Sequence, residues 1–273
     1  MKAKDLRQLL DSAAKVAPQL SVSDVAVLRV LARLFDANDD AAVKIVGMMF
    51  GKSSVAVLYA KEAGISKPAD LLGKRIARAA AGASANMFPA FLKANNIDRA
   101  GIKEVVANSS SFFPLLMSKQ VDAVLDQSSY LGRYRDGAKG AGLTIEAFRF
   151  ADFGLDLYGD AILVEKGMIE KNPDLIRRFI AATLKGNAYA FDNPDEAIAI
   201  LRKTNSELVA PIAKEELLDT KELALTSEVA QHGLGYIDAN HMERTQAVVS
   251  GALGLKRHVP LNEIYTLDLL PKR

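Results

Sequence analysis

The order of apolar segments in this chain predicts an α/β protein with two lobes. Short runs rich in β-branched residues alternate with segments of helical periodicity, which is the pattern of sheets flanked by helices. The chain has 273 residues, enough for two modest domains. Two strand-like runs, Val55–Tyr59 and Tyr158–Glu165, are placed to carry the chain out of a first α/β block and back into it.

These two crossings define the expected domain boundaries. We expect lobe one to contain residues 1–62 and 161–273, and lobe two to contain residues 63–160, with a hinge near 59–64 and 156–162. Each lobe is expected to hold a mostly parallel sheet flanked by helices. Because ligands of open α/β sheets bind at the carboxyl ends of strands, a ligand cleft is expected between the lobes.

The expected elements of lobe one begin with two helices and two strands. Apolar residues at helical spacing predict a helix over Leu6–Val16, and Pro18 ends it. A strand over Leu20–Asp24, a helix over Val25–Phe35 and a strand over Val43–Phe50 follow.

Lobe two is expected to be a compact βαβαβ unit followed by one more strand. After Glu165 only helical patterns remain, and two helices start with the Asn-Pro signal at Asn172 and Asn193. The expected strands of lobe two are Arg75–Ala79, Ile102–Ala107, Val121–Leu125 and Leu143–Phe150, its helices are Ala85–Ala94 and Phe112–Ser118, and the later helices of the tail include Glu215–Leu225 and Met242–Leu253.

Composition excludes several classes of function. The absence of cysteine excludes disulfides, a thiolate nucleophile and cysteine-based zinc. The net charge is only +2, and the lysine and arginine residues are scattered along the chain, so no nucleic-acid partner is expected. His232, His241 and His258 are not at metal-ligand spacing and are expected at the surface, so we expect no metal and no cofactor. No apolar run reaches membrane-spanning length.

A glycine-serine loop between a strand and a helix is the first candidate binding site. Gly82, Ser84 and Asn86 lie where a helix N-terminus offers free N–H groups to polar or anionic ligand atoms. The alternative is that Ser84 only caps its helix.

The segment Asn108–Pro114 repeats this design after the next strand. Ser110 is a candidate polar contact, and Phe112 or Phe113 is a candidate stacking face for a ligand. The alternative is that both rings belong to the core, and for Phe113 that alternative is favoured.

The strongest polar candidates follow the strand Val121–Leu125. Asp126, Gln127 and Tyr130 come directly after its carboxyl end, where ligand donors and acceptors are expected. A hydrolase would need a nucleophile with a histidine partner, and Ser53 and Ser84 have no plausible one within their lobe, which favours binding over nucleophilic catalysis.

Other candidates come from lobe one and the crossing. Ser23 and Asp24 end a strand, although Asp24 is better explained as a helix cap. Ser53 follows a glycine-lysine pair that resembles a phosphate loop. Three residues separate Gly47 from Gly51 where that loop needs four, so a nucleotide site is rejected.

Tyr158 lies at the return crossing, where it is placed to stack on a planar ligand. Gly159 is placed to absorb backbone rotation during closure, and the alternative for both is an ordinary turn. The acidic residues Glu215, Glu216, Asp219 and Glu222 are expected to form a solvated helix face.

Several segments in this order resemble the solute-binding proteins of ABC importers of the nitrate, taurine and thiamine-precursor group. The resemblance implies a two-lobed periplasmic-binding-protein fold of type II and no enzymatic activity. The segments that carry it are Val22–Leu28, Val43–Ser53, Ile65–Ala77, Met117–Val124 and Asn172–Ala182.

The resemblance also implies the partners. They are a small solute, with a planar thiamine pyrimidine precursor as the best guess, and an ABC permease. Oxyanions, sulfonates and flavins stay open as solutes. A periplasmic or membrane-associated location and a monomeric state are implied, although the residues before Leu20 do not resemble a signal peptide or the family's opening strand and loop.

Two alternatives to a solute-binding protein stay open. The resemblance extends to a fungal pyrimidine-precursor synthase, which depends on an active-site histidine and a cysteine-rich motif. This chain has no cysteine and no histidine before His232, so an enzyme is disfavoured. The other alternative is a truncated relic that binds nothing.

Overall fold

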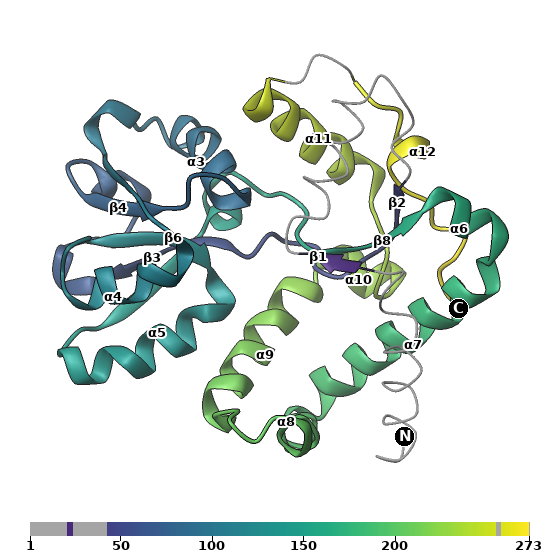
Figure 1. Cartoon of the computed structure of the whole chain (residues 1–273). Helices are drawn as coiled ribbons and strands as arrows, with labels where there is room; N and C mark the ends of the chain where they lie inside the picture. Colours follow the sequence, from purple (N-terminus) through teal and green to yellow (C-terminus); the bar gives the residue numbers. More distant parts are fainter. Residues whose placement is uncertain (1–20, 24–42, 255–257, 273) are drawn as a thin grey trace. The chain divides into compact units, whose positions relative to one another are not determined.

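The computed structural model describes residues 21–23, 43–254 and 258–272, and it confirms the α/β class (Figure 1). The helices expected over Leu6–Val16 and Val25–Phe35 lie outside these ranges. Within them, no helix combines the length and the apolar character that crossing a bilayer requires.

The chain divides into two compact units, each with its own sheet. Unit 1 lies within residues 1–52, 157–210 and 220–273, and unit 2 comprises residues 53–156 and 211–219. These boundaries differ from the expected ones in three places. Residues 157–160 belong to unit 1 rather than to lobe two. The strand that starts at Val55 belongs to unit 2 rather than to lobe one, and so does a short stretch of the helical tail.

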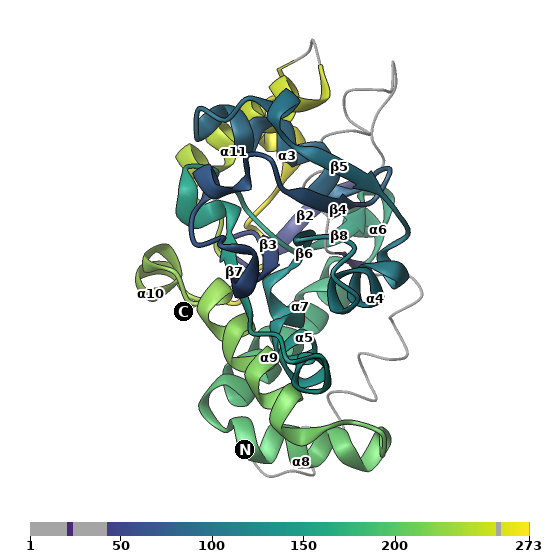
Figure 2. The ribbon, with the colours of Figure 1, turned by 90° about the vertical axis from the view of Figure 1, so that its left-hand side faces the viewer.

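The sheet of unit 2 is mixed: β4, β5, β6 and β7 run in one direction, and β3 runs in the opposite one. Its strands lie in the order β5-β4-β6-β3-β7, side by side in Figure 2. The helical crossovers make β4, β5 and β6 parallel, whereas β3 runs antiparallel to both β6 and β7. The strands are β3 (Val55–Ala60), β4 (Arg75–Arg78), β5 (Lys103–Val106), β6 (Ala123–Gln127) and β7 (Ile145–Arg149).

These directions bring several chain segments to one edge of the sheet. Because β3 pairs antiparallel with Val55 opposite Gln127 and Ala56 opposite Arg149, its first residues lie beside the last residues of β6 and β7. The ends of β4 and β5 lie at the same edge because both strands run parallel to β6. We call this the carboxyl-end edge of unit 2.

Helices cover both faces of this sheet. Helix α3 (Ala83–Ala94) lies on one side, and α4 (Phe112–Met117) and α5 (Leu131–Ala138) lie on the other (Figure 1). The α3 side holds stacked aromatic rings, with the centroids of Phe91 and Phe150 4.1 Å apart. The α4–α5 side packs Phe112 and Tyr134 against alternate residues of β3, because side chains of a strand point to opposite faces.

Unit 1 contains a smaller sheet of order β1-β8-β2. Both described pairings are antiparallel, so the expected parallel sheet is not found in this part of the described chain. The core packs β2 and β8 against α7, whose Ile176, Ile180 and Leu184 recur every four residues on one helix face. The strands are β1 (Ser21–Ser23), β2 (Val43–Met48) and β8 (Ala161–Glu165).

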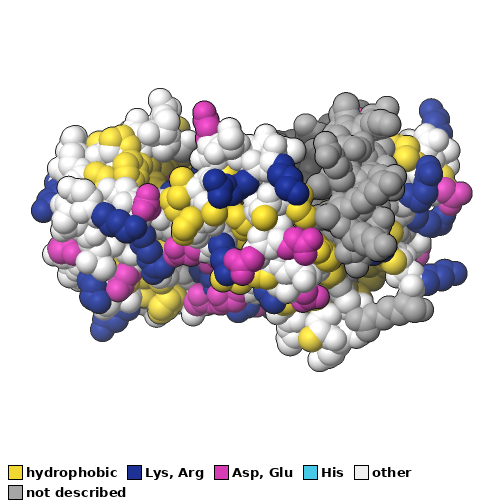
Figure 3. Space-filling view, turned by 90° about the horizontal axis from the view of Figure 1, so that it is seen from below, with side chains coloured by type: hydrophobic (Ala, Val, Ile, Leu, Met, Phe, Trp, Pro, Cys, Tyr) yellow, Lys and Arg dark blue, Asp and Glu magenta, His cyan; other side chains and the backbone are white. Residues whose placement is uncertain are grey.

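The helical tail follows the predicted start signals. Pro173 and Pro194 each occupy the first turn of a helix, as the Asn-Pro pairs predict. The helices are α6 (Lys166–Lys171), α7 (Pro173–Asp192), α8 (Pro194–Thr204), α9 (Ala210–Ala224), α10 (Ser227–His232), α11 (Ala239–Leu253) and α12 (Leu261–Ile264). On the face shown in Figure 3, Lys/Arg and Asp/Glu side chains are interspersed.

Candidate functional site

The carboxyl-end edge of unit 2 gathers most of the predicted binding residues. The parallel strands β4, β5 and β6 each end here and lead into a helix or a helical turn, so their connecting turns share one edge. The predicted residues in these turns, and at the start of β3, are Ser53, Gly82, Ser84, Asn86, Ser110, Asp126, Gln127 and Tyr130.

Gly82 sets the start of α3. Its backbone has φ 119° and ψ 176°, a conformation that L-residues with a side chain rarely adopt, and no other group lies within 4 Å of the position a Cβ would take. Gly82 is itself the N-cap, so the alternative that Ser84 caps this helix is wrong. Ser84 is half-buried in the first turn, and Asn86 is exposed.

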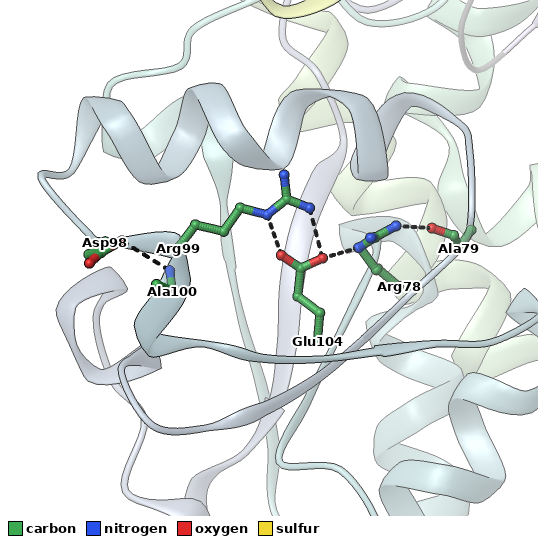
Figure 4. Close-up of polar contacts among 6 residues, drawn as sticks. All are labelled: Arg78, Ala79, Asp98, Arg99, Ala100 and Glu104. Atoms are coloured by element: carbon green, nitrogen blue, oxygen red, sulfur yellow. Dashed lines mark hydrogen bonds and ion pairs between the residues drawn. The ribbon is translucent and has the colours of Figure 1, made fainter.

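A cluster of charged side chains joins the end of β4 to the start of β5 (Figure 4). Glu104 lies between the guanidinium groups of Arg99 and Arg78 and pairs with both. Hydrogen bonds from Arg99 and Arg78 lower the pKa of Glu104 to about 2. Arg78 Nη1 also donates to the carbonyl of Ala79 (3.0 Å), so this cluster fixes the start of the loop that leads to Gly82.

The turn after β5 separates its two phenylalanines. Ser109, Ser110 and Ser111 form a 3₁₀ turn, and Ser110 is exposed. Phe112 is 1% exposed and lies in the core, whereas Phe113 is 37% exposed. This reverses the expectation, because Phe112 offers no stacking face and Phe113 is the accessible ring.

Asp126 points into unit 2. Its Oδ2 accepts a hydrogen bond from the hydroxyl of buried Tyr134 (2.9 Å), and its Oδ1 accepts one from the backbone N–H of Gln127 (3.0 Å). Burial raises the pKa of Asp126 and that of Tyr134. The carboxylate therefore stabilises the packing of α5 on the sheet.

The turn after Asp126 is fixed from two sides. The N–H of Ser128 donates to the carbonyl of Ser54 (2.8 Å), and its hydroxyl donates to Asp219 Oδ2 (2.9 Å). Arg149 Nε donates to the same hydroxyl (3.1 Å). The half-buried ring of Tyr130 ends the turn, with the guanidinium carbon of Arg133 5.2 Å from its centroid. Sequence reasoning missed Ser128, Arg149 and Asp219 as members of this site.

Ser53 lies at the start of β3, at the same edge. Its hydroxyl accepts a hydrogen bond from the N–H of Val55 (3.3 Å). The neighbouring glycine has a packing role, because a Cβ on Gly51 would lie 2.6 Å from Cγ2 of Thr226. This close approach accounts for the glycine at position 51 without a phosphate ligand.

The acidic face of α9 is only partly solvated, because Glu216 and Asp219 are shielded while the Glu215 side chain is 43% exposed. Arg135 Nη1 donates to Glu215 Oε1 (2.6 Å) and Arg133 Nη2 to Glu216 Oε2 (3.1 Å). Asp219 pairs with Arg149. Glu222 is exposed.

Tyr158 lies in unit 1 within a buried network. Its ring stacks on that of His241 with centroids 4.0 Å apart. Its hydroxyl donates to Glu228 Oε2 (3.1 Å) and accepts from the N–H of Asp238 (2.7 Å). Burial raises the pKa of Tyr158. His241 is buried, so the expected surface position is wrong for it, whereas His232 and His258 are exposed.

Two more predicted residues and one glycine complete the set. Ser23 ends β1, and Asp24 lies outside the described residues. A Cβ on Gly159 would lie 2.6 Å from the carbonyl oxygen of Lys52, so this glycine is required by a close backbone approach. No group of three or more His, Cys, Asp or Glu side chains in the described ranges is placed to hold a metal ion.

The fold defines the class of this protein as the type II periplasmic-binding-protein class. A solved structure with this fold is the periplasmic aliphatic sulphonate binding protein SsuA from Escherichia coli, with a TM-score of 0.67 and 18% identity. That match covers 97% of this chain and 85% of the other. The chain belongs to the NMT1/THI5 like family, whose model matches residues 19–197, more than half of its length.

Two curated relatives are named as binding proteins. The riboflavin-binding protein RibY of Chloroflexus aurantiacus is 28% identical over 136 residues, which is 49% of this chain and 38% of that protein. The formylaminopyrimidine-binding protein of Halalkalibacterium halodurans is 25% identical over 136 residues, 50% of this chain and 40% of that protein. Each match therefore spans about two fifths of the relative's length.

An enzyme shares the fold as well. The desulfurization enzyme DSZB matches with a TM-score of 0.58 and 15% identity over 92% of this chain and 83% of the other. The fold alone is thus compatible with binding and with catalysis.

Proposed function

We propose that this chain binds a small planar heterocycle at the carboxyl-end edge of unit 2 and delivers it to an ABC permease. The best guess for the solute is a pyrimidine precursor of thiamine. The names of the two curated relatives support this choice, since riboflavin and formylaminopyrimidine both contain a flat heteroaromatic ring. A periplasmic location and a monomeric state are part of the proposal.

The observation that carries the proposal is the topological switch point between β4 and β6. The chain leaves β4 through α3 on one face of the sheet and leaves β6 toward α5 on the other face. Ligands of open α/β sheets bind outside the strand ends at such a point. Gly82 and Ser84 flank it on one side, and Gln127 and Tyr130 flank it on the other.

These groups suit a planar heterocycle. The N–H groups in the first turn of α3 and the hydroxyl of Ser84 are donors, and the Gln127 amide is both donor and acceptor. Ring nitrogens and carbonyl oxygens of a heterocycle need such partners. The ring of Tyr130 is half-buried, and it supplies an aromatic surface on which a flat ligand can stack.

We propose binding without turnover. The curated relatives are named for binding, and the sequence contains no cysteine nucleophile. An enzyme on this fold, as DSZB is, would consume a substrate. Formation of a product from pyridoxal phosphate or from a generic ester would contradict this part of the proposal.

Calorimetric titration with riboflavin and with formylaminopyrimidine tests the proposal. We expect one of them to bind, and Tyr130→Ala to weaken that binding about tenfold, because the aromatic contact is lost. Tyr189→Ala is the matched control, since this half-buried tyrosine of α7 lies in unit 1 and its hydroxyl bonds Glu196 (2.6 Å). A folded protein that binds neither of these solutes contradicts the proposal, and binding of taurine or nitrate in their place contradicts the choice of a planar heterocycle.

A further inference from the structure

The turn between β6 and α5 depends on residues far away in the sequence. Ser128 is buried, and its hydroxyl bonds both Arg149 at the end of β7 and Asp219 of α9. Arg149 and Asp219 also pair directly. Their side chains are 12% and 18% exposed, so this three-residue network is largely shielded from water.

The sheet register fixes one side of the network. Arg149 lies opposite Ala56 of β3, and Gln127 lies opposite Val55 of the same strand. The two residues are therefore the last ones of β7 and β6, the two strands that flank β3, and they lie at one edge of the sheet. The Ser128 N–H bond to Ser54 anchors the turn to the start of the same strand. Arg149 therefore reaches the hydroxyl of Ser128 from a rigid position.

Helix α9 supplies the other side. Glu215 and Glu216 lie about one turn before Asp219, and they pair with Arg135 and Arg133 of α5. Gly132 permits this approach, because a Cβ there would lie 3.1 Å from Glu215 Oε2. The first part of α9 is thus held against α5 by two ion pairs, and Asp219 contacts the turn that precedes α5.

We infer that Arg149 and Asp219 are positioning residues of the binding edge. They hold the hydroxyl of Ser128, and through it they fix the orientation of its neighbours Gln127 and Tyr130. The inference rests on the proposed function, because these neighbours are the proposed solute contacts. It adds that an element distant in sequence, α9, sets the affinity of the edge.

The affinity test compares two variants of one helix. D219N removes the charge that holds the turn, and E215Q removes an ion pair with Arg135 that does not touch it. With whichever of riboflavin and formylaminopyrimidine the wild type binds, we expect D219N to raise Kd about tenfold and E215Q to change it by less than about twofold. Equal affinities of D219N and the wild type overturn the inference and leave the proposed function intact.

Two further variants separate positioning from general stability. S128A removes only the shared hydroxyl. If Ser128 and Asp219 act through the same contact, the double variant S128A/D219N should bind the solute no more weakly than whichever single variant has the higher Kd. Losses of affinity that add in the double variant overturn the inference. R149K keeps the positive charge but lacks the planar guanidinium fork of arginine, whereas R149Q lacks both. We expect R149K to lose less affinity for the solute than R149Q. Equal losses in R149K and R149Q overturn the role of the positive charge.

Hydrogen exchange decides the inference separately from solute binding. The amide of Ser128 donates to Ser54 and reports opening of the turn. We expect its exchange in the solute-free protein to be faster in D219N than in E215Q, with the amides of β6 unchanged. If the wild type binds neither solute, the proposed function fails, and this comparison still supports the inference when the rates differ and overturns it when they agree.

Discussion

Two charged clusters of unit 2 perform similar structural work from different sources. In the first, Glu104 at the start of β5 joins Arg78 at the end of β4 and Arg99 in the turn before β5, so all three lie within one stretch of the chain. In the second, Asp219 joins Arg149 and Ser128 from 70 and 91 residues away. Each cluster fixes the chain just beyond a strand end. The comparison shows that the edge is built partly from neighbouring segments and partly from a helix that folds back onto it.

The clusters also differ in their exposure to water. Arg99 is 48% exposed and shares Glu104 with Arg78, so solvent and a second cation moderate each pair. Arg78 and Glu104 are themselves about as shielded as Arg149 and Asp219, with side chains 18% and 15% exposed against 12% and 18%, so the difference between the clusters lies in Arg99. Breaking a buried pair leaves an uncompensated charge, which costs more than breaking an exposed one. The second cluster should therefore be the more sensitive to substitution.

The largest expected effect is that of Asp219→Ala. It leaves Arg149 without this carboxylate and Ser128 without its acceptor, and we expect a loss of about 3 kcal/mol in the free energy of unfolding. Urea denaturation at pH 7 measures it. The control is the double substitution Arg149→Met with Asp219→Leu, which removes both charges and should lose less. A single-variant loss under about 1 kcal/mol would contradict the burial argument.

The second prediction concerns Glu104 and pH. The pKa of Glu104 is lowered to about 2, so its pairing stabilises the fold fully above the ordinary carboxyl range and is lost as the pH falls from about 4.5 toward 2. We expect Glu104→Gln to cost about 2 kcal/mol at pH 7, less than the full shift implies because Arg99 is solvent-exposed.

The measurement is urea denaturation of the wild type and of Glu104→Gln between pH 2 and pH 7. The difference between the two proteins should shrink as the pH falls through this range. A difference that stays constant with pH would show that the arginines do not hold the carboxylate in its charged form.

The third prediction tests how closely α9 approaches α5. A Cβ on Gly132 would lie 3.1 Å from Glu215 Oε2 and 3.5 Å from Cγ2 of Ile212, whereas nothing lies within 4 Å of one on Gly251 of α11. Alanine favours a helix over glycine by about 1 kcal/mol, so Gly251→Ala should stabilise the protein by up to that amount. The change in the free energy of unfolding for Gly132→Ala should be about 1 kcal/mol less favourable than that for Gly251→Ala, because Glu215 must move aside. Equal thermal shifts for the two variants would refute the close approach.

Much of the first cluster's surroundings was predictable from the sequence. The strand, glycine-serine loop and helix from Arg75 to Ala94 are local patterns, and the structure places their polar residues at one edge as expected. The second cluster was not predictable. Nothing in the pattern of α9 shows that Glu215, Glu216 and Asp219 meet arginines, because an acidic stripe on a helix is compatible with solvent.

The same limit explains the other corrections. The pattern of Val55–Tyr59 predicts a strand, but pairing direction and sheet membership depend on distant partners, so its place between β6 and β7 could not be read from it. Adjacent Phe112 and Phe113 differ by one step around a helix, and only the packing decides which is buried. The sequence around His241 of α11 does not indicate that the ring of Tyr158, far away in the chain, stacks on it.

The smallest expected effect sharpens the comparison within one helix. Glu216 lies less than one turn from Asp219 and also pairs with an arginine, but Arg133 is 62% exposed. Exposed pairs contribute about 0–1 kcal/mol, so Glu216→Gln should lower the free energy of unfolding by less than about 0.5 kcal/mol. The screening length falls from about 10 Å at 0.1 M salt to about 3 Å at 1 M, so the Glu216→Gln loss should disappear in 1 M sodium chloride. Most of the Asp219→Ala loss should persist, because salt screens a buried pair much less. Urea denaturation at both salt concentrations measures this, and equal losses in the two variants would show that burial does not separate the two pairs.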